Sequence, residues 1–306
     1  DEREAEAQKV DDLHKSAAEN HVAQCRAFLG RMKIGLDHLS SDPLSMRAFR
    51  LANRAILIQQ LRSRRSSRIP EFDSRSKRLV FSESISGIDE LAEHSGRGRW
   101  RAFQIAFILA AVKSMADARD AGRDIVDLIW FPTGGGKTEA YLGIAAFAIL
   151  MRRLKNPHDS GVEVLMRYTL RLLTAQQFLR ASGLICALES IRRENASDLG
   201  EQEISIGVWL GGDTTPNSKK DAITELRSLK KGKKYDNPFM VERCPWCGAL
   251  MGPQEYTNRS NKAAPKLPGY EEAGGTIKFK CPDRDCDFAD GLPLYVIDED
   301  LYESPP

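Results

Sequence analysis

The amino-acid sequence predicts an α/β protein in which helices flank a parallel β-sheet. From residue 100 to residue 238, short apolar runs suited to buried strands alternate with apolar segments of helical length. The alternation of strand and helix implies right-handed crossovers between parallel strands, which predicts the sheet. The expected strands are 125–131, 162–166 and 204–210, and the expected helices are 100–115, 138–154 and 172–193.

The first 99 residues are expected to form a mainly helical accessory region. Apolar residues recur at helical spacing from Met46 to Ile56, and a stretch rich in Ser and Arg, 63–77, then interrupts the pattern. Basic residues outnumber acidic ones from 47 to 78 and again cluster from 219 to 234, so that either cluster could meet phosphate. A solvated helix face followed by a loop explains the same charges without a ligand.

The helices of the predicted sheet have recognisable features. The segment that begins at Trp100 is apolar on nearly every face, as expected of a buried helix. The helix that begins at Thr138 is expected to end before Pro157, because Arg152 and Arg153 then lie in its last turn, where cations interact favourably with the helix dipole.

Composition indicates a soluble chain of one or two domains. The chain has 306 residues, of which 42% are apolar and 29% are charged, and its formal net charge is +2. No apolar run approaches the roughly 18 to 20 residues that span a bilayer, and the charged N-terminal segment lacks the apolar core of a secretory signal. We therefore expect a cytoplasmic protein with no membrane contact. Because the sequence begins without Met and ends in Ser-Pro-Pro, we expect it to be part of a longer chain.

The junction between the first expected strand and the next helix carries a phosphate-binding loop. Its sequence is Phe131-Pro132-Thr133-Gly134-Gly135-Gly136-Lys137-Thr138, with glycines that let the backbone approach phosphates and a helix whose first N–H groups point at them. Lys137 is expected to reach the β- and γ-phosphates of ATP and Thr138 to bind Mg²⁺, so both are assigned to catalysis. A glycine-rich turn without chemistry is the alternative. The residues assigned to nucleotide binding are Thr133, Gly134, Gly135, Gly136, Lys137 and Thr138.

A glutamine upstream of this loop is assigned to the nucleotide base. The segment Arg101-Ala102-Phe103-Gln104 resembles the Q motif of superfamily-two helicases, in which a Gln amide pairs with two edges of adenine. A polar residue on a helix surface is the alternative interpretation of Gln104.

Two downstream segments resemble the nucleic-acid contacts of the same helicases. The segment 164–176 resembles motif Ia, a strand followed by Thr, Arg, Leu and Gln at the start of a helix, although Tyr168 replaces the usual Pro and Leu170 is an additional residue. A Gly doublet follows the third expected strand, in helicase order. The residues assigned to nucleic acid are Thr169 and Arg171, as phosphate contacts, together with Gln176, Gly211 and Gly212.

Together these stretches resemble one family, the DrmA helicase subunits of the DISARM anti-phage defence system. The likeness spans roughly residues 100–300 and is most specific in the phosphate loop and in the segment 166–171. The resemblance implies the N-terminal portion of a DNA helicase, with a RecA-like P-loop parallel sheet and flanking helices. It also implies a bacterial defence complex whose other subunits include a methyltransferase.

Two cysteine pairs predict a structural zinc site. Cys244 and Cys247 lie in Cys-Pro-Trp-Cys-Gly, and Cys281 and Cys286 lie in Cys-Pro-Asp-Arg-Asp-Cys, so that each pair can hold one side of a tetrahedral ion. Four thiolates leave no open coordination position, so the zinc is expected to support folding rather than catalysis. Disulfides are the alternative, which a cytoplasmic location disfavours.

The motifs predict a division of the chain into domains. The expected parts are an accessory region at 1–99, the first RecA-like ATPase domain at 100–238, a zinc ribbon inserted at 239–290, and the start of a return to the ATPase domain at 291–306. Hydrolysis by such motors requires an acidic pair after a strand, for which Asp298 and Glu299 are the candidates. A linker leaving the ribbon is the favoured interpretation of this pair, so the chain is expected to bind ATP without the full catalytic set.

Two functions are compatible with these motifs. The first is the ATP-binding part of a superfamily-two DNA helicase or translocase in anti-phage defence, an ATP hydrolase with ATP, Mg²⁺ and Zn²⁺ as cofactors and DNA as partner. The second is a P-loop ATPase that switches a protein scaffold and recruits proteins through its zinc ribbon, without nucleic acid. The motif Ia segment and the Gly doublet favour the first.

Overall fold

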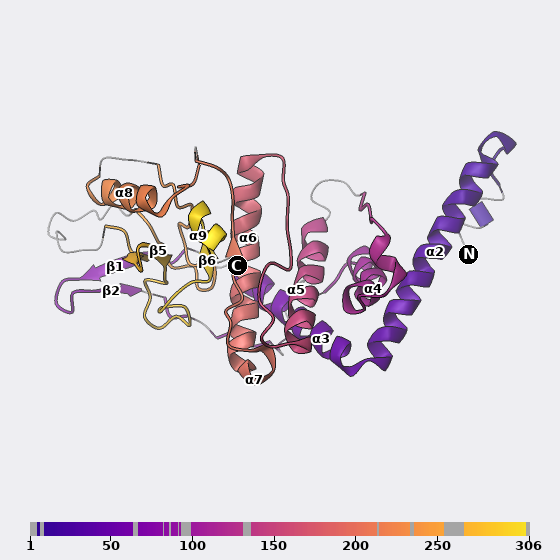
Figure 1. The fold of residues 1–306 in the computed structure, drawn as a ribbon, viewed down its shortest axis with the longest axis horizontal. Helices are drawn as coiled ribbons and strands as arrows, with labels where there is room; N and C mark the ends of the chain where they lie inside the picture. Colours follow the sequence, from indigo (N-terminus) through magenta and orange to yellow (C-terminus); the bar gives the residue numbers. More distant parts are fainter. Residues whose placement is uncertain are drawn as a thin grey trace. The chain divides into compact units, whose positions relative to one another are not determined.

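The computed structural model shows a chain made mostly of helices, with short strands between them (Figure 1). It divides into two compact units, Asp1–Ala52 with Arg99–Lys155, and Asn53–Gly98 with Asn156–Pro306. None of the helices in the described residues has the length and apolar character that crossing a membrane requires. The structure describes residues 5–6, 9–63, 67–81, 83–85, 87–90, 92, 99–130, 136–212, 214–232, 236–253 and 266–303.

The first unit is helical. α2 packs along α4, and α4 packs against α5. The close approach of α2 and α4 depends on Gly35, because a Cβ at this position would overlap the carbonyl oxygen of Leu109. The elements of this unit are α2 (Asp12–Ser41), the first part of α3 (Pro43–Arg62), α4 (Ala102–Ala116), the 3₁₀ helix η1 (Ala121–Asp124) and α5 (Lys137–Lys155).

The apolar sides of α4 and α5 form the core of this unit. Ile108 and Val112 of α4 are buried, as are Leu142 and Leu150 of α5. α5 can lie close to Trp100 because residue 143 is Gly, where a Cβ would come within 2.8 Å of the indole ring. The helices expected at 100–115 and 138–154 are therefore confirmed as α4 and α5.

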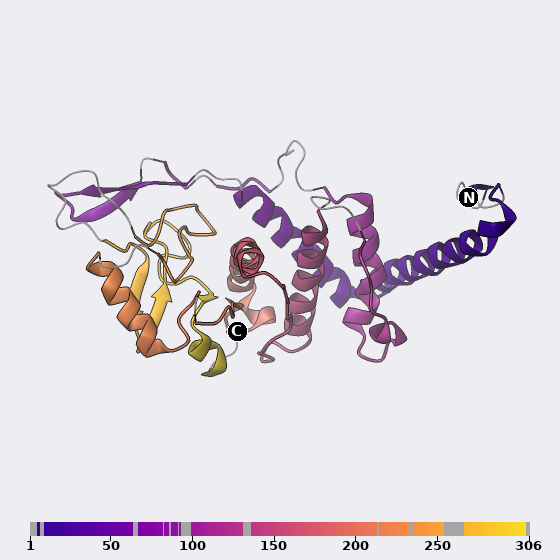
Figure 2. The ribbon, with the colours of Figure 1, turned by 90° about the horizontal axis from the view of Figure 1, so that it is seen from above.

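The second unit combines two antiparallel strand pairs with helices. β1 pairs with β2, and β4 pairs with β5, which lies beside α8 (Figure 2). The helix expected at 172–193 is confirmed as α6. The elements of this unit are the second part of α3, β1 (Pro70–Asp73), β2 (Arg78–Phe81), α6 (Arg171–Glu194), α7 (Ala196–Leu199), β3 (Ile206–Gly207), α8 (Lys219–Lys230), β4 (Tyr270–Ala273), β5 (Thr276–Phe279), β6 (Leu294–Tyr295) and α9 (Asp298–Glu303).

A buried carboxylate of α6, paired with arginines of the same helix, also bonds to the segment before β3. The Glu189 carboxylate, 1% exposed, receives two hydrogen bonds of 2.7 Å from Arg192 and one of 2.9 Å from Arg193. It also accepts a hydrogen bond from the backbone N–H of Ile204 at 3.0 Å. Because a buried carboxylate is costly unless it is paired, this arrangement determines how the segment before β3 meets α6.

The predicted RecA-like parallel sheet is wrong for the described residues. About half of the described residues are helical, and the parallel pairing among them consists of two short strands, with Ile206 opposite Leu294 and Gly207 opposite Tyr295, and an isolated bridge between Arg68 and Ala249. Residues 125–130 and 162–166 form no strand, and Phe131, the last residue of the first expected strand, lies outside the described residues.

The apolar residues of the first expected strand are exposed instead of buried in a sheet. Val126, Leu128 and Trp130 are 95%, 85% and 86% exposed. A parallel strand is stable only when neighbouring strands pair with it and helices cover both faces of the sheet. An apolar run reports that a segment favours burial, but it carries no information on whether partners are in place.

Candidate functional site

Gly136, the last glycine of the predicted phosphate-binding loop, leads directly into α5. Gly136 has a φ of 86°, a left-handed conformation that Gly adopts without strain. Lys137 is the first residue of α5 and Thr138 the second, so both lie in the first turn, whose backbone N–H groups favour anions. The remaining residues assigned to this loop, Thr133, Gly134 and Gly135, lie outside the described residues.

Gln104 connects this loop to the start of α4. The side chain is 4% exposed, and its Nε2 group donates a hydrogen bond of 2.7 Å to the carbonyl oxygen of Gly136. Its Oε1 atom accepts a hydrogen bond of 2.8 Å from the backbone N–H of Arg101, which closes a capping box at the N-terminus of α4. Both ends of the amide are therefore bonded to backbone, whereas an adenine-reading Gln would need them for the base.

The close packing at Gly136 adds a second constraint. A Cβ at this position would come within 2.8 Å of the Gln104 Nε2 atom. Any other residue at 136 would therefore strain the backbone and also displace the Gln104 amide.

The motif Ia residues lie at the start of α6. Thr169 and Gln176 are exposed, as contact with nucleic acid requires. Arg171 is the first residue of α6, and its side chain is not among those that the structure describes. The apolar side chains of Leu170 and Leu172 are 65% and 74% exposed beside them.

The Gly doublet forms a turn after β3. Gly211 has a φ of 79°, and its carbonyl oxygen accepts hydrogen bonds from the backbone N–H groups of Thr214 and Thr215 at 3.0 and 3.2 Å. In the part of the chain that the structure describes, no hydrogen bond joins Gly211 or Gly212 to Thr169 or Gln176. The doublet therefore belongs to a turn held by local backbone hydrogen bonds.

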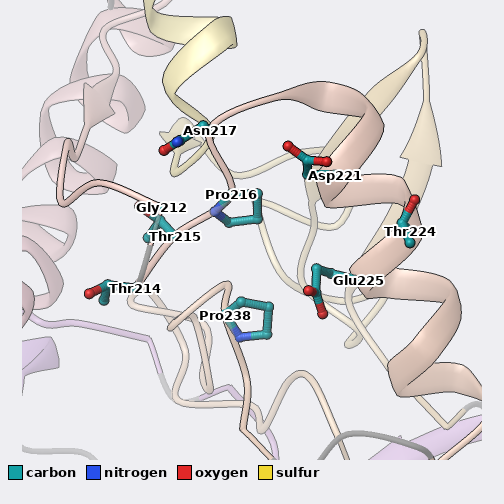
Figure 3. Close-up of a pocket in the computed structure, with 9 residues that line it drawn as sticks. All are labelled: Gly212, Thr214, Thr215, Pro216, Asn217, Asp221, Thr224, Glu225 and Pro238. Atoms are coloured by element: carbon teal, nitrogen blue, oxygen red, sulfur yellow. The ribbon is translucent and has the colours of Figure 1, made fainter.

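A pocket of about 250 Å³ lies beside Gly212. Asp221 and Glu225 of α8 line it from one side, and Gly212 and residues 214–217 line it from the other (Figure 3). Asp221 accepts a hydrogen bond of 2.7 Å from the Ser218 hydroxyl at the N-terminus of α8. Because these carboxylates repel phosphate, the pocket does not support a phosphate contact at Gly212.

The four predicted metal ligands come together in one buried cluster. The sulfur atoms of Cys244, Cys247, Cys281 and Cys286 all lie within 4.8 Å of one another. The distances are 4.0 Å between the sulfurs of Cys244 and Cys286 and 3.4 Å between those of Cys247 and Cys281. Sulfurs around a tetrahedral ion with metal–sulfur bonds of about 2.3 Å are about 3.8 Å apart, so the cluster fits such an ion. Both distances are far longer than a disulfide bond of about 2.05 Å.

The charge balance of the cluster also favours a cation. Four thiolates packed together repel each other strongly unless a bound cation offsets their charge.

Backbone hydrogen bonds form the two turns that present these sulfurs. The Gly248 N–H donates to the carbonyl of Cys244 at 2.9 Å, and Gly248 has a φ of 79°, which explains the glycine after the first pair. In the second turn, the Cys286 N–H donates to the carbonyl of Asp283 at 3.2 Å. Each turn therefore holds its cysteine pair in a fixed direction.

Two arginines from the helices stack on aromatic residues of these turns. The Arg62 guanidinium lies 3.5 Å from the centre of the Trp246 ring, and the Arg193 guanidinium lies 4.8 Å from that of Phe288. The Trp246 indole N–H donates to Asp287 at 2.7 Å. The sequence shows no local signal for these contacts, because the partners lie far apart in the chain.

Asp298 and Glu299 follow the parallel pair of β3 and β6 at the start of α9. Asp298 is buried, and burial raises the pKa of its carboxyl group. Glu299 accepts a hydrogen bond of 2.7 Å from the backbone N–H of Lys219, and Asp300 accepts one of 2.6 Å from the Thr276 hydroxyl. Glu299 and Asp300 thus bind α8 and β5, which favours the interpretation of this segment as a structural link.

Comparison with known proteins gives a relative of this chain. No protein-family model matches it. DISARM protein DrmA of Bacillus paralicheniformis is 35% identical to it over a match of 307 aligned positions, and the match covers 96% of this chain. The chain spans 25% of the length of that protein. The resemblance to the DrmA family in the predicted phosphate loop and in the segment 166–171 is therefore confirmed: over nearly its whole length, this chain is similar to a part of DISARM protein DrmA.

Proposed function

We propose that this chain is the ATP-binding part of a DNA helicase or translocase that acts in DISARM anti-phage defence. The observation that carries the proposal is the Gly-Lys-Thr sequence at the start of α5, with Gly136 in a left-handed conformation and bonded to Gln104. The similarity to DISARM protein DrmA supports the defence role. The proposed partners are DNA and the other subunits of a defence complex, including a methyltransferase, as the resemblance of the motifs implies.

The residues at the start of α5 have the chemistry that ATP and Mg²⁺ require. The Lys137 ammonium group supplies a positive charge for the β- and γ-phosphates, and the Thr138 hydroxyl supplies an oxygen ligand for Mg²⁺. The backbone N–H groups of the first turn can donate hydrogen bonds to phosphate oxygens. When bound, Mg²⁺ neutralises phosphate charge and polarises the terminal phosphoryl group. Thr133, Gly134 and Gly135 complete the proposed nucleotide site.

The chain is proposed to bind nucleotide rather than to hydrolyse it alone. Of the acidic residues at the start of α9, Glu299 and Asp300 are hydrogen-bonded to neighbouring elements. Hydrolysis then depends on groups elsewhere in the full-length protein, which is consistent with a chain that spans 25% of its relative.

The motor and scaffold functions differ in their response to DNA. The test is the ATPase rate of the full-length protein, with single-stranded and double-stranded DNA, compared with its Lys137→Ala variant. The motor proposal predicts stimulation by at least one form of DNA, with activity lost in the variant. An ATPase that no DNA stimulates would refute the motor and leave the protein-scaffold function.

The cysteine cluster is proposed to hold one Zn²⁺ ion in a structural role. Four buried thiolates match the preference of zinc for soft ligands and leave no position open for a substrate. The proposal predicts about one zinc ion per chain in protein purified without chelators. Chelation is expected to unfold the segment 239–290 and to leave the helices of the first unit intact, which hydrogen exchange can measure.

A further inference from the structure

Arg68 places a buried positive charge beside the cysteine cluster. Its side chain is 5% exposed, and its Nη1 atom lies 2.8 Å from the Asp283 carboxylate, between the two cysteines of the second pair in sequence. The Nε and Nη2 groups both donate to the carbonyl oxygen of Glu83. The guanidinium also lies 4.8 Å from the centre of the Phe81 ring.

The backbone of Arg68 pairs with the turn that contains the first cysteine pair. The Arg68 N–H donates to the carbonyl of Gly248 at 2.9 Å, and the Leu250 N–H donates to the carbonyl of Arg68 at the same distance. These bonds form a parallel bridge opposite Ala249. Arg68, two residues before β1, is thereby fixed against the segment that follows Cys247.

Burial alone would lower the pKa of Arg68, but its pairing with Asp283 raises that pKa, so the guanidinium stays charged in this buried position.

A metal ion held by the four cysteines would leave a net negative charge that the Arg68 guanidinium can offset. Four thiolates around one Zn²⁺ ion carry a net charge of about −2, which is costly in a buried site. A guanidinium is always protonated and offers five N–H donors, so it offsets part of this charge whatever the pH. Groups that bond to metal ligands orient them and strengthen metal binding.

We propose that the Arg68 side chain is a positioning group of the metal centre: its ion pair with Asp283 holds the turn of the second cysteine pair, and its charge offsets that of the thiolates, so that the segment before β1 is required for tight metal binding. The proposal rests on the proposed zinc site. It gives one member of the basic cluster 47–78 a role inside the protein instead of at phosphate.

The test compares metal binding by Arg68→Gln and Arg68→Lys with that of the wild-type chain. Zinc affinity is measured by competition with a chromogenic chelator, and the environment of the thiolates is measured by the sulfur-to-cobalt charge-transfer band of the Co²⁺ form. Arg227→Gln is the matched control, because Arg227 pairs with Glu272 of β4 at 2.9 Å but is 62% exposed. Circular dichroism establishes that each zinc-loaded variant is folded.

Arg68→Gln is expected to weaken zinc binding by about tenfold or more, which is the size of effect that loss of a group around the metal ligands has in other metal sites, and to shift the cobalt band. Arg68→Lys keeps the charge and is expected to recover part of the affinity. Arg227→Gln is expected to match the wild type.

Three results would overturn parts of this account, and they differ from one another. A wild-type chain without bound metal would refute the zinc site itself. One zinc ion in the wild type with unchanged affinity and an unchanged cobalt band in Arg68→Gln would refute only the role of Arg68. If Arg68→Gln does not fold, the result for Arg68→Lys takes its place. A Lys variant with the zinc affinity and the cobalt band of the wild type would refute a role for the hydrogen-bonding geometry of the guanidinium.

Discussion

At the scale of single residues, one buried amide connects the start of α4 to the start of α5. Gln104 bonds to the backbone of Arg101 at 2.8 Å and to that of Gly136 at 2.7 Å. Because Gly136 immediately precedes Lys137, the amide fixes the point at which the phosphate loop enters its helix. A role in positioning the loop affects every nucleotide alike, whereas a role in reading adenine affects ATP alone.

Gln104→Ala is therefore predicted to weaken ATP and GTP binding to the same extent. The loss of one buried hydrogen bond costs about 1–3 kcal/mol, so the expected effect on each affinity is about tenfold. Equilibrium titration with fluorescent ATP and GTP analogues measures both affinities, and the exposed Gln24 provides the matched control as Gln24→Ala. If ATP affinity fell while GTP affinity stayed the same, Gln104 would be an adenine reader.

Glu189 is predicted to stabilise the second unit through its charge. Burial would raise its pKa, but hydrogen bonds from Arg192 and the Ile204 N–H outweigh burial and lower it from 4.5. Since the folded-state pKa lies below the unfolded one, this contribution to stability is present at neutral pH and is lost as pH falls below about 4.5 through the folded-state pKa.

The variant Glu189→Gln should thus lower the free energy of unfolding by about 3 kcal/mol at pH 7, because it leaves Arg192 buried without its partner. Urea denaturation at pH 7 and pH 4 measures the difference, which should shrink at the lower pH. Glu272→Gln, which removes a surface pair with Arg227, is expected to cost less than about 1 kcal/mol. Equal costs for the two variants would contradict the account of Glu189.

At the scale of elements, the packing of α2 on α4 depends on the absence of a side chain at one position. A Cβ on Gly35 would overlap the Leu109 carbonyl oxygen, whereas Gly30 of the same helix has no atom within 4 Å of the corresponding position. The two glycines therefore differ in packing while they share a helical backbone.

The variants Gly35→Ala and Gly30→Ala are predicted to have opposite effects on stability. Gly35→Ala should destabilise the chain by about 1–3 kcal/mol, because the two helices must move apart. Gly30→Ala should stabilise it by up to about 1 kcal/mol, since Ala favours the helix more than Gly does. Thermal unfolding followed by circular dichroism measures both, and a stabilising Gly35→Ala would show that the helices are not in close contact.

Helices and the cysteine cluster could be predicted from the sequence, whereas the sheet could not. α4, α5 and α6 follow from local apolar patterns, and the cluster follows from the spacing of Cys244, Cys247, Cys281 and Cys286. Strand formation at 125–130 depends on partners that an apolar run does not specify, and its side chains are exposed instead. The contacts of Arg68 with Gly248 and Asp283 join distant parts of the chain and have no local pattern.

At the scale of the whole molecule, each proposed centre belongs to one unit. Gln104, Gly136 and Lys137 lie in the first unit, whereas the cysteine cluster, the Gly doublet and the motif Ia segment lie in the second. The residue proposed to position each centre lies in the same unit as that centre: Gln104 for the nucleotide site and Arg68 for the metal site. Nucleotide binding is the claim on which the proposed motor depends.

The binding of ATP by this chain in the presence of Mg²⁺, measured by isothermal titration calorimetry, tests that claim most directly. The comparison is with Lys137→Ala, and with Lys33→Ala as a control that removes the same charge from an exposed position of α2. The account predicts saturable binding with a stoichiometry of about one, weakened at least about tenfold in Lys137→Ala and unchanged in Lys33→Ala. Equal ATP affinities in the wild type and Lys137→Ala would contradict it.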